Sequence, residues 1–160
     1  MLSSVAVTWP SARAIAAAVQ IVQARYGPTP LSPAPHDPAF PAYQQFLHLG
    51  EAGLATLMMV PLVSRFIAPE AERENWGAAW AAECVERRLK LVRRQLEGSP
   101  YMAGEAFTAA DISITYALEL GRNHAGFVLG DAEEAYLART MGRDAFKTAL
   151  GNSQPDAVQP

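Results

Sequence analysis

The sequence is poor in cysteine, with Cys84 the only one among 160 residues. A single cysteine excludes an internal disulfide and any Cys-x-x-Cys metal or redox motif. A chain without disulfides suits a reducing compartment, so we expect a cytoplasmic protein. Cys84 lies in the middle of an expected helix, far from a helix N-terminus or a positioned base. We therefore interpret it as a buried core residue and not as a nucleophile.

Charged residues are also scarce, at 18% of the chain, and their net charge is −3. This balance gives no general electrostatic reason to bind nucleic acid or an acidic membrane, so we predict neither partner. The uncharged runs, among them residues 1–12 and 52–64, are too short for a membrane-spanning helix. The first residues lack the basic opening of a secretory signal. No acid precedes Asp37, yet we do not expect a transit peptide.

Clusters of metal ligands are missing as well. The three histidines, His36, His48 and His124, are far apart in sequence, and none has a second histidine or a cysteine at helical spacing. We therefore predict no metal site. No Ser-His-Asp arrangement or nucleophile elbow stands out either, so the motifs identify no catalytic residue.

The chain has no segment with the alternating pattern of a β-strand, and half of its residues are hydrophobic. Apolar residues recur instead at helical spacing, which predicts an all-α protein, a helical bundle. Four prolines in residues 27–37 indicate an extended linker. The expected organisation is an N-terminal segment with one helix (1–27), a proline-rich linker (28–37), a helical domain (38–151) and a disordered tail (152–160). The expected helices cover residues 11–26, 38–66, 69–97, 109–120, 132–141 and 144–150, with Pro61 kinking the second helix or ending it early.

The start of the helix at 109–120 is the best-specified local feature. Thr108 stands at the N-cap, and Asp111, three residues later, can reach back to the amide of Thr108 in a capping box. Phe107 and Ile112 flank this box at the spacing of a hydrophobic staple. The helix itself is apolar almost all round, so we expect it to be buried. We interpret Thr108 and Asp111 as structural capping residues and not as catalytic ones.

The helix expected over residues 69–97 carries two other clusters. Five basic residues alternate with acidic ones, which favours a solvated helix face over an anion-binding site. They are Arg87, Arg88, Lys90, Arg93 and Arg94. Trp76 and Trp80 are one turn apart, and we favour core packing or a subunit contact over a binding platform.

The run 101–112, with Gly104, Phe107, Thr108, Ala110, Asp111 and Ile112, resembles the "GxxFTxADI" segment of the glutathione S-transferase superfamily. In that family the segment opens the central helix of the C-terminal helical domain. Residues 24–28 resemble the end of the last helix of the family's first domain, and residues 31–38 resemble its interdomain linker. Residues 135–146 resemble the family's "YxxRxxxRPAF", with Asp144 in place of proline. The resemblance covers residues 11–150.

This resemblance implies a helical bundle like the C-terminal domain of the family, without the thioredoxin-like domain except for its last helix. In the family that helix opens with Glu-Ser, which holds the γ-glutamyl carboxylate of glutathione. The matching positions here are Ala14-Ile15 or, in a shifted register, Ser11-Ala12. We therefore expect no glutathione-binding or catalytic residue in this chain. Glutathione remains the family's co-substrate, and no cofactor is expected to bind to this chain.

The family's helical domain supplies the wall of the pocket for the electrophile that receives the glutathione thiol. By position, the resemblance assigns this role to Leu54, Leu57, Met58 and Tyr116. Ordinary core packing is the competing interpretation, and we favour it for the aliphatic residues. The expected ligand is a hydrophobic electrophile or another small apolar molecule. Without its companion domain the bundle should expose apolar surface, which predicts self-association or a homodimer.

Whether the chain is an enzyme stays open at this stage. One hypothesis is a truncated glutathione transferase, inactive alone. The alternative is a non-catalytic protein-interaction module of the same helical type, as found in translation factors and synthetase complexes.

Overall fold

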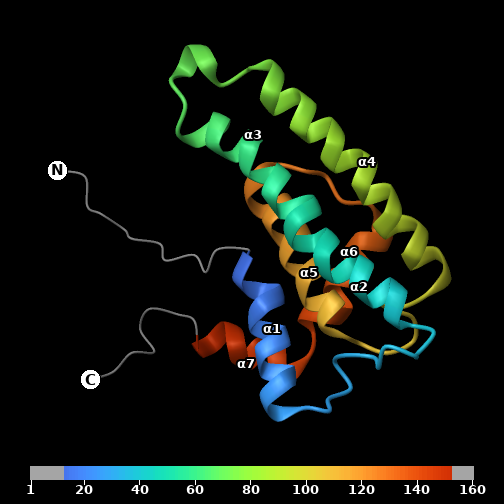
Figure 1. Cartoon of the computed structure of the whole chain (residues 1–160). Helices are drawn as coiled ribbons and strands as arrows, with labels where there is room; N and C mark the ends of the chain where they lie inside the picture. Colours follow the sequence, from blue (N-terminus) through green and yellow to red (C-terminus); the bar gives the residue numbers. More distant parts are fainter. Residues whose placement is uncertain (1–12, 153–160) are drawn as a thin grey trace, which may run out of the picture.

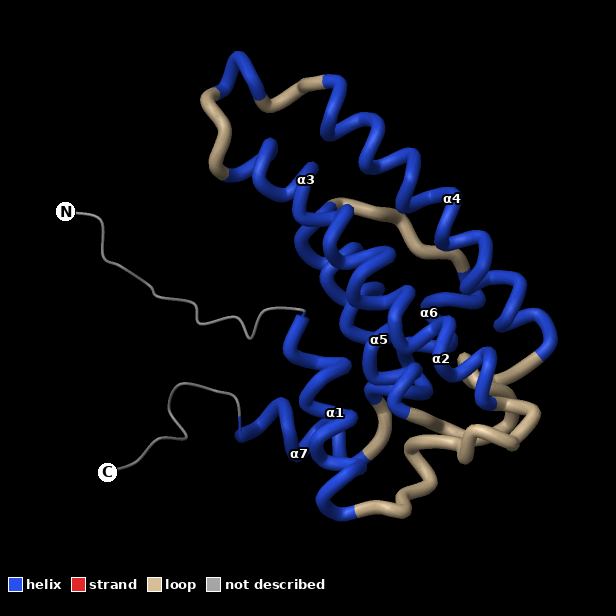
Figure 2. The backbone as a smooth tube through the Cα atoms, viewed as in Figure 1, coloured by secondary structure: helices blue, strands red, loops and turns tan. Residues whose placement is uncertain are grey.

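The computed structural model describes residues 13–152, and these residues form a bundle of α-helices (Figures 1 and 2). Within this range the only β feature is an isolated bridge between Tyr101 and Gly104. The all-α prediction is therefore confirmed. The α-helices are α1 (Arg13–Tyr26), α2 (Phe40–His48), α3 (Thr56–Phe66), α4 (Trp76–Gly98), α5 (Ala109–Leu120), α6 (Asp131–Met141) and α7 (Asp144–Asn152). The expected tail lies outside the described residues, apart from Asn152 at the end of α7.

α2 and α3 belong to one continuous helical stretch, from Phe40 to Phe66, joined by a π-helical segment at Leu49–Ala55. In this segment the amide of Thr56 bonds to the carbonyl of Glu51, five residues back. Pro61 lies inside α3 without ending it. The expected irregularity thus occurs earlier in the chain, at the π-segment, which the hydrophobic pattern did not indicate. A second π-segment, Gly121–Ala125, follows α5.

The first π-segment lies unusually close to α5. A Cβ atom added to Gly50 would lie 2.5 Å from backbone and side-chain atoms of Ser113. The Ser113 hydroxyl donates a hydrogen bond to the carbonyl of Leu47 across the same contact (2.7 Å). Only a residue without a side chain permits this approach. Gly50 therefore fixes how closely the long helix and α5 can pack.

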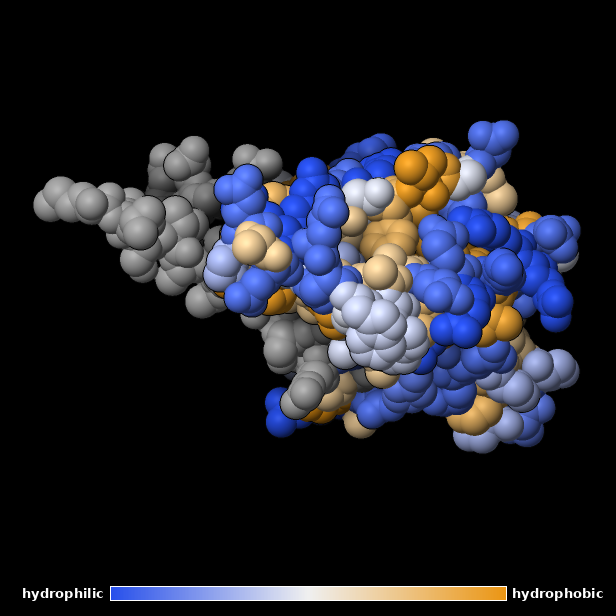
Figure 3. Space-filling model, turned by 90° about the horizontal axis from the view of Figure 1, so that it is seen from above, coloured by the Kyte–Doolittle hydropathy of each residue, from blue (hydrophilic) through white to orange (hydrophobic). Residues whose placement is uncertain are grey.

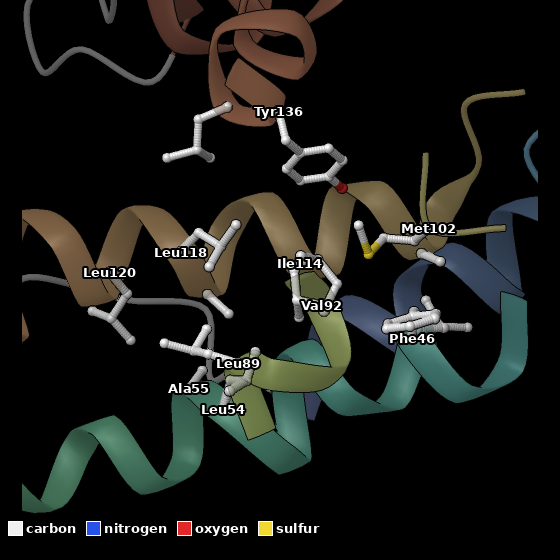
Figure 4. Packing of buried hydrophobic residues seen from close by; sticks show 14 of the residues in the cluster. Phe46, Leu54, Ala55, Leu89, Val92, Met102, Ile114, Leu118, Leu120 and Tyr136 are labelled. Atoms are coloured by element: carbon white, nitrogen blue, oxygen red, sulfur yellow. The ribbon is translucent and has the colours of Figure 1, made fainter. Parts of the chain in front are cut away.

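α5 runs through the centre of the bundle, and nine of its twelve residues are buried. Figure 4 shows Ile114 and Leu118 of α5 among buried side chains of the surrounding helices. This burial agrees with the expectation from its apolar sequence. The buried partners include Phe46, Leu54, Leu89, Val92, Met102 and Tyr136.

The stretch Phe40–Phe66 is also long and apolar enough, by length and composition, to cross a membrane. The lengths of the uncharged runs alone did not indicate this. Its central part packs on α5 through Phe46, Leu47 and Leu54, which are buried in the core. The bundle core therefore accounts for part of its apolar character, while other apolar residues of the stretch, Met59, Val63 and Phe66, are exposed.

Candidate functional site

The buried polar centre of the molecule is the carboxylate of Asp111 at the start of α5. Its Oδ2 accepts hydrogen bonds from the Thr108 amide (2.8 Å) and the Thr108 hydroxyl (3.1 Å). Its Oδ1 accepts from the Met102 amide (2.8 Å) and the Tyr136 hydroxyl (2.9 Å). The capping box is thus formed, and two partners outside α5 join it. Asp111 has no solvent exposure, so the carboxylate organises the fold and cannot reach a substrate.

Burial and hydrogen bonding act in opposite directions on this group. Burial raises the pKa of Asp111 above its ordinary value, while the hydrogen bonds from Met102, Thr108 and Tyr136 lower it. Burial also raises the pKa of Tyr136, and the neighbouring Asp111 charge raises it further. Tyr136 therefore stays protonated and serves as a permanent hydrogen-bond donor to the carboxylate.

A cavity of about 420 Å³ lies between α5 and the C-terminal part of the bundle. α5 contributes one wall, and the end of α6 and the start of α7 contribute the other. The lining residues are Phe107, Ile112, Thr115, Tyr116, Glu119, Thr140, Arg143, Ala145, Phe146 and Ala149. Its volume falls in the range of pockets that hold small organic molecules, about 300–1,000 Å³.

Most of the cavity lining is apolar or already engaged within the chain. The hydroxyls of Thr115 and Thr140 bond to each other (2.9 Å), and Glu119 forms a salt bridge with Arg122. The Arg143 guanidinium stacks over the Phe107 ring, 3.4 Å from its centroid. The cavity therefore offers a ligand an apolar volume with few polar groups, the arrangement typical of sites for small apolar molecules.

Tyr116 is the predicted pocket residue that lines this cavity. Burial raises the pKa of its phenol, and the negative charge of Glu51 raises it further. The phenol consequently remains protonated at neutral pH, and it can donate a hydrogen bond to a ligand but cannot act as a base there.

The other predicted pocket residues lie elsewhere. Leu54 and Met58 are fully buried in the core, and Leu57 is half-buried against it. None of the three lines the cavity beside Tyr116. The structure therefore does not gather the four residues around this cavity, and their role in binding stays a prediction.

The sequence reasoning did not identify the aromatic residues of the cavity as a site. Phe107 and Ile112 were interpreted only as a hydrophobic staple, and Arg143 and Phe146 only as part of a family signature. The signal that was present is the spacing of Ile112, Tyr116 and Glu119, one turn apart on α5.

On α4, Cys84 is buried, as expected, and its sulfur accepts a hydrogen bond from Arg87 (3.0 Å). Trp76 and Trp80 stack on each other, with ring centroids 6.1 Å apart, but their side chains are exposed. Core packing of these two tryptophans is thus excluded. The sequence of the first turns of α4 does not show which face is buried, because alanines occur on both.

The basic cluster of α4 divides between two environments. Arg93 forms a short salt bridge with the buried Glu133 (2.6 Å), and Arg88 donates to the carbonyl of Gly53. Lys90 and Arg94 are exposed. The expected solvated face therefore holds for only part of the cluster. No group of three or more potential metal ligands occurs among residues 13–152.

Structural comparison places the chain beside solved glutathione transferases. It matches BphK, a bacterial glutathione transferase, at 25% identity and a TM-score of 0.69, over 85% of this chain and 65% of that one. It matches a glutathione transferase of Actinobacillus pleuropneumoniae at 22% identity and a TM-score of 0.70, over 87% and 62% of the two chains. A theta-class enzyme of Xanthomonas axonopodis pv. citri, solved with glutathione bound, matches at 20% identity and a TM-score of 0.70, over 85% and 71%.

The chain thus spans somewhat less than two thirds of the length of the first two structures. No protein-family model and no curated protein sequence matches it. The match covers most of this chain, a helical bundle with α5 at its centre. The "GxxFTxADI" segment forms the capped start of α5. The chain is a glutathione S-transferase-like protein, with the helical fold of that superfamily's C-terminal domain.

Proposed function

We propose that the chain acts in the conjugation of glutathione to electrophiles and contributes the part that binds the electrophile. The observation that carries this proposal is the cavity beside α5, an apolar volume of about 420 Å³ with Tyr116 among its lining residues. The similarity to glutathione transferases supports the reaction class. The ligand class that fits is a small aromatic or aliphatic electrophile with one hydrogen-bond acceptor.

The chemistry requires a glutathione thiolate next to this ligand. A donated hydrogen bond lowers the pKa of a thiol and so produces the nucleophile. The cavity would hold the electrophile away from water, and the protonated Tyr116 would stabilise negative charge that develops on it. Neither candidate register of α1 supplies the family's Glu-Ser pair, so glutathione and its activating group would need residues from outside this chain.

Titration calorimetry and a fluorescent apolar probe, anilinonaphthalene sulfonate, test the proposal together. We expect no binding of glutathione and no conjugation of a chlorodinitrobenzene by this chain alone, but saturable binding of the probe. Phe146→Ala and Tyr116→Phe should weaken probe binding. Phe66→Ala, at an exposed aromatic residue outside the cavity, serves as the matched control.

Two outcomes would contradict the proposal. Tight glutathione binding or turnover would show that the chain holds a glutathione site after all. Equal probe binding by Phe146→Ala and the wild-type chain would show that the cavity is not the apolar site.

We further propose that the protein is cytoplasmic and self-associates.

An alternative function is a non-catalytic interaction module. The observation that favours it is the exposed Trp76–Trp80 pair, because stacked tryptophans at a surface are typical anchors of protein contacts. An intact-mass measurement of the natural protein separates the two functions, since residues before Met1 would favour the enzyme.

A further inference from the structure

Two charged residues, Glu119 and Arg143, line the cavity beside α5, and they differ in how their charges are balanced. Glu119 forms a salt bridge with Arg122 and accepts a further hydrogen bond from Asn123 (3.1 Å). Arg143 forms no salt bridge with any carboxylate of residues 13–152. The cavity wall therefore presents one cation that has no counter-ion in this part of the chain.

The position of this cation is set by stacking. The central carbon of the Arg143 guanidinium lies 3.4 Å above the centre of the Phe107 ring, and the residue is half-buried. All five N–H donors of a guanidinium lie in its plane, so stacking on one face leaves them at the edge. Such a planar fork matches the two oxygens of a carboxylate. Arg143 is thus oriented to receive a planar anion before any ligand binds.

The two charged residues lie at opposite ends of the cavity. Arg143 stacks on Phe107, which precedes the N-cap of α5, whereas Glu119 belongs to the last turn of the same helix. Ile112 and Glu119 both line the cavity, and their separation of seven residues corresponds to about 10 Å along a helix axis. An anionic group is therefore attracted to the end near Phe107 and repelled from the other end.

Between these ends the lining is apolar and partly aromatic, with Ile112, Tyr116 and Phe146. Aromatic side chains pack well against the ring of a ligand through offset or edge contacts. The negative charge of Glu51 acts on Tyr116, so an anionic group in this part of the cavity would be unfavourable. The cavity thus suits a molecule with an apolar ring and one anionic group at its end.

We propose that the cavity selects small aromatic acids, with the ring between α5 and α7 and the carboxylate paired with Arg143. Arg143 is then the residue that determines specificity for the electrophile. This inference rests on the proposed function, because it takes the cavity as the ligand site. It narrows the ligand class from apolar molecules in general to aromatic electrophiles that carry an acidic group.

A matched pair of probes tests the preference for an anion. Anilinonaphthalene sulfonate is unsuitable here, because its own sulfonate is charged. Naphthoate and naphthylmethanol share one ring system and differ in charge, and titration calorimetry with the full chain measures the dissociation constant of each. Naphthoate should bind about tenfold more tightly at low salt. This ratio should fall towards one at high salt, because salt screens a partly exposed ion pair.

Substitution of Arg143 tests its role directly. Arg143→Met removes the charge and keeps an apolar stem beside Phe107, so it should weaken naphthoate binding about tenfold and change naphthylmethanol binding less than about twofold. Arg139→Met is the matched control. Arg139 also lies over an aromatic ring, that of Tyr101 (5.8 Å), but does not line the cavity. The control should leave both dissociation constants unchanged, and circular dichroism verifies that each variant is folded.

A second control concerns apolar residues at the surface, which an aromatic probe could contact without entering the cavity. Figure 3 views the end that carries the α3–α4 connection and shows apolar atoms among charged ones at the surface. Exposed apolar residues at this end include Phe66 and Ile67. Phe66→Ala should therefore leave the binding of both probes unchanged, whereas Phe146→Ala, in the cavity wall, should weaken both.

The outcomes distinguish this inference from the proposed function. Equal affinity of the wild-type chain for the two probes would overturn the role of Arg143 and leave the proposed function intact. Equal effects of Arg143→Met and Arg139→Met on naphthoate binding would have the same meaning. If neither probe binds, or if Phe146→Ala weakens neither, the cavity is not a ligand site and both proposals are wrong.

Discussion

α5 and α4 are both long helices of the same bundle, but they satisfy their polar groups in different ways. α5 is buried, and the one carboxylate at its start receives four hydrogen bonds from within the chain. α4 buries only one side, and on its exposed side Lys90 and Arg94 form no salt bridge among residues 13–152. A buried polar group needs an internal partner because water cannot reach it, whereas an exposed face can leave its partner to another molecule. Substitutions of buried residues in α5 should therefore reduce stability, and those on the exposed side of α4 should change it little.

The largest effect is expected from Asp111→Ala. This change leaves the amides of Met102 and Thr108 and the hydroxyl of Tyr136 without their acceptor, and each such buried group costs about 1–3 kcal/mol. We expect a loss of about 3–5 kcal/mol in the free energy of unfolding, measured by urea denaturation. Asp144→Ala, at the exposed start of α7, is the control and should cost less than about 0.5 kcal/mol. Similar losses of unfolding free energy in both variants would contradict the structural role assigned to the buried carboxylate of Asp111.

The next effect concerns the close packing of the long helix on α5. Gly50→Ala forces a methyl group against Ser113, and overpacking of this kind costs about 1–3 kcal/mol. Gly98→Ala, at the end of α4, meets no atom within 4 Å and should be neutral or slightly stabilising. Thermal unfolding of the two variants measures the difference. An unchanged melting temperature for Gly50→Ala would show that the two helices can separate without loss.

A smaller, pH-dependent effect is expected for Tyr136→Phe. The folded pKa of Asp111 is raised above 3.8 by burial, so this group contributes stability at low pH that is lost as pH rises through the folded pKa. The Tyr136 hydroxyl supports the charged form, and its removal raises the pKa of Asp111 further. The variant should therefore lose about 1 kcal/mol at neutral pH and less near pH 4. Urea denaturation at both pH values tests this, and a larger loss at low pH would contradict the assigned direction.

The smallest effect on folding is expected for Trp76→Ser on the exposed side of α4. Its side chain is 79% exposed, so the free energy of unfolding of the monomer should change by less than about 0.5 kcal/mol. The measurement is urea denaturation at low protein concentration, where association contributes little. A loss of several kcal/mol would show that the indole pair supports the fold of its own chain.

The same contrast explains what the sequence could predict. The capping box spans four residues, so its geometry follows from local spacing. Tyr136 and Met102 could not be identified as further partners of Asp111, because only the packing of α6 and of the preceding loop brings them there. The aromatic wall of the cavity depends in the same way on where α7 docks.

The extent of a helix could be predicted from the sequence, but the face that it buries could not. The extent of α4 follows from its breakers, but alanines on several sides of its first turns do not tell which face is buried. Trp76 and Trp80 were therefore open to core packing, which the structure excludes. The π-segment at Leu49–Ala55 also has no signature in the hydrophobic pattern, and it lies where Gly50 closely approaches α5.

The Asp111 junction also has a consequence for the order of folding. Its bonds to Thr108 lie within one helical turn and can form as soon as α5 begins. Its bond to Tyr136 closes a loop of 25 residues and forms only when α6 has docked. Closing such a loop costs entropy before any contact compensates it. Docking of α6 on α5 should thus limit the rate at which the four hydrogen bonds of Asp111 are completed. The capping box at the start of α5 can form before this step.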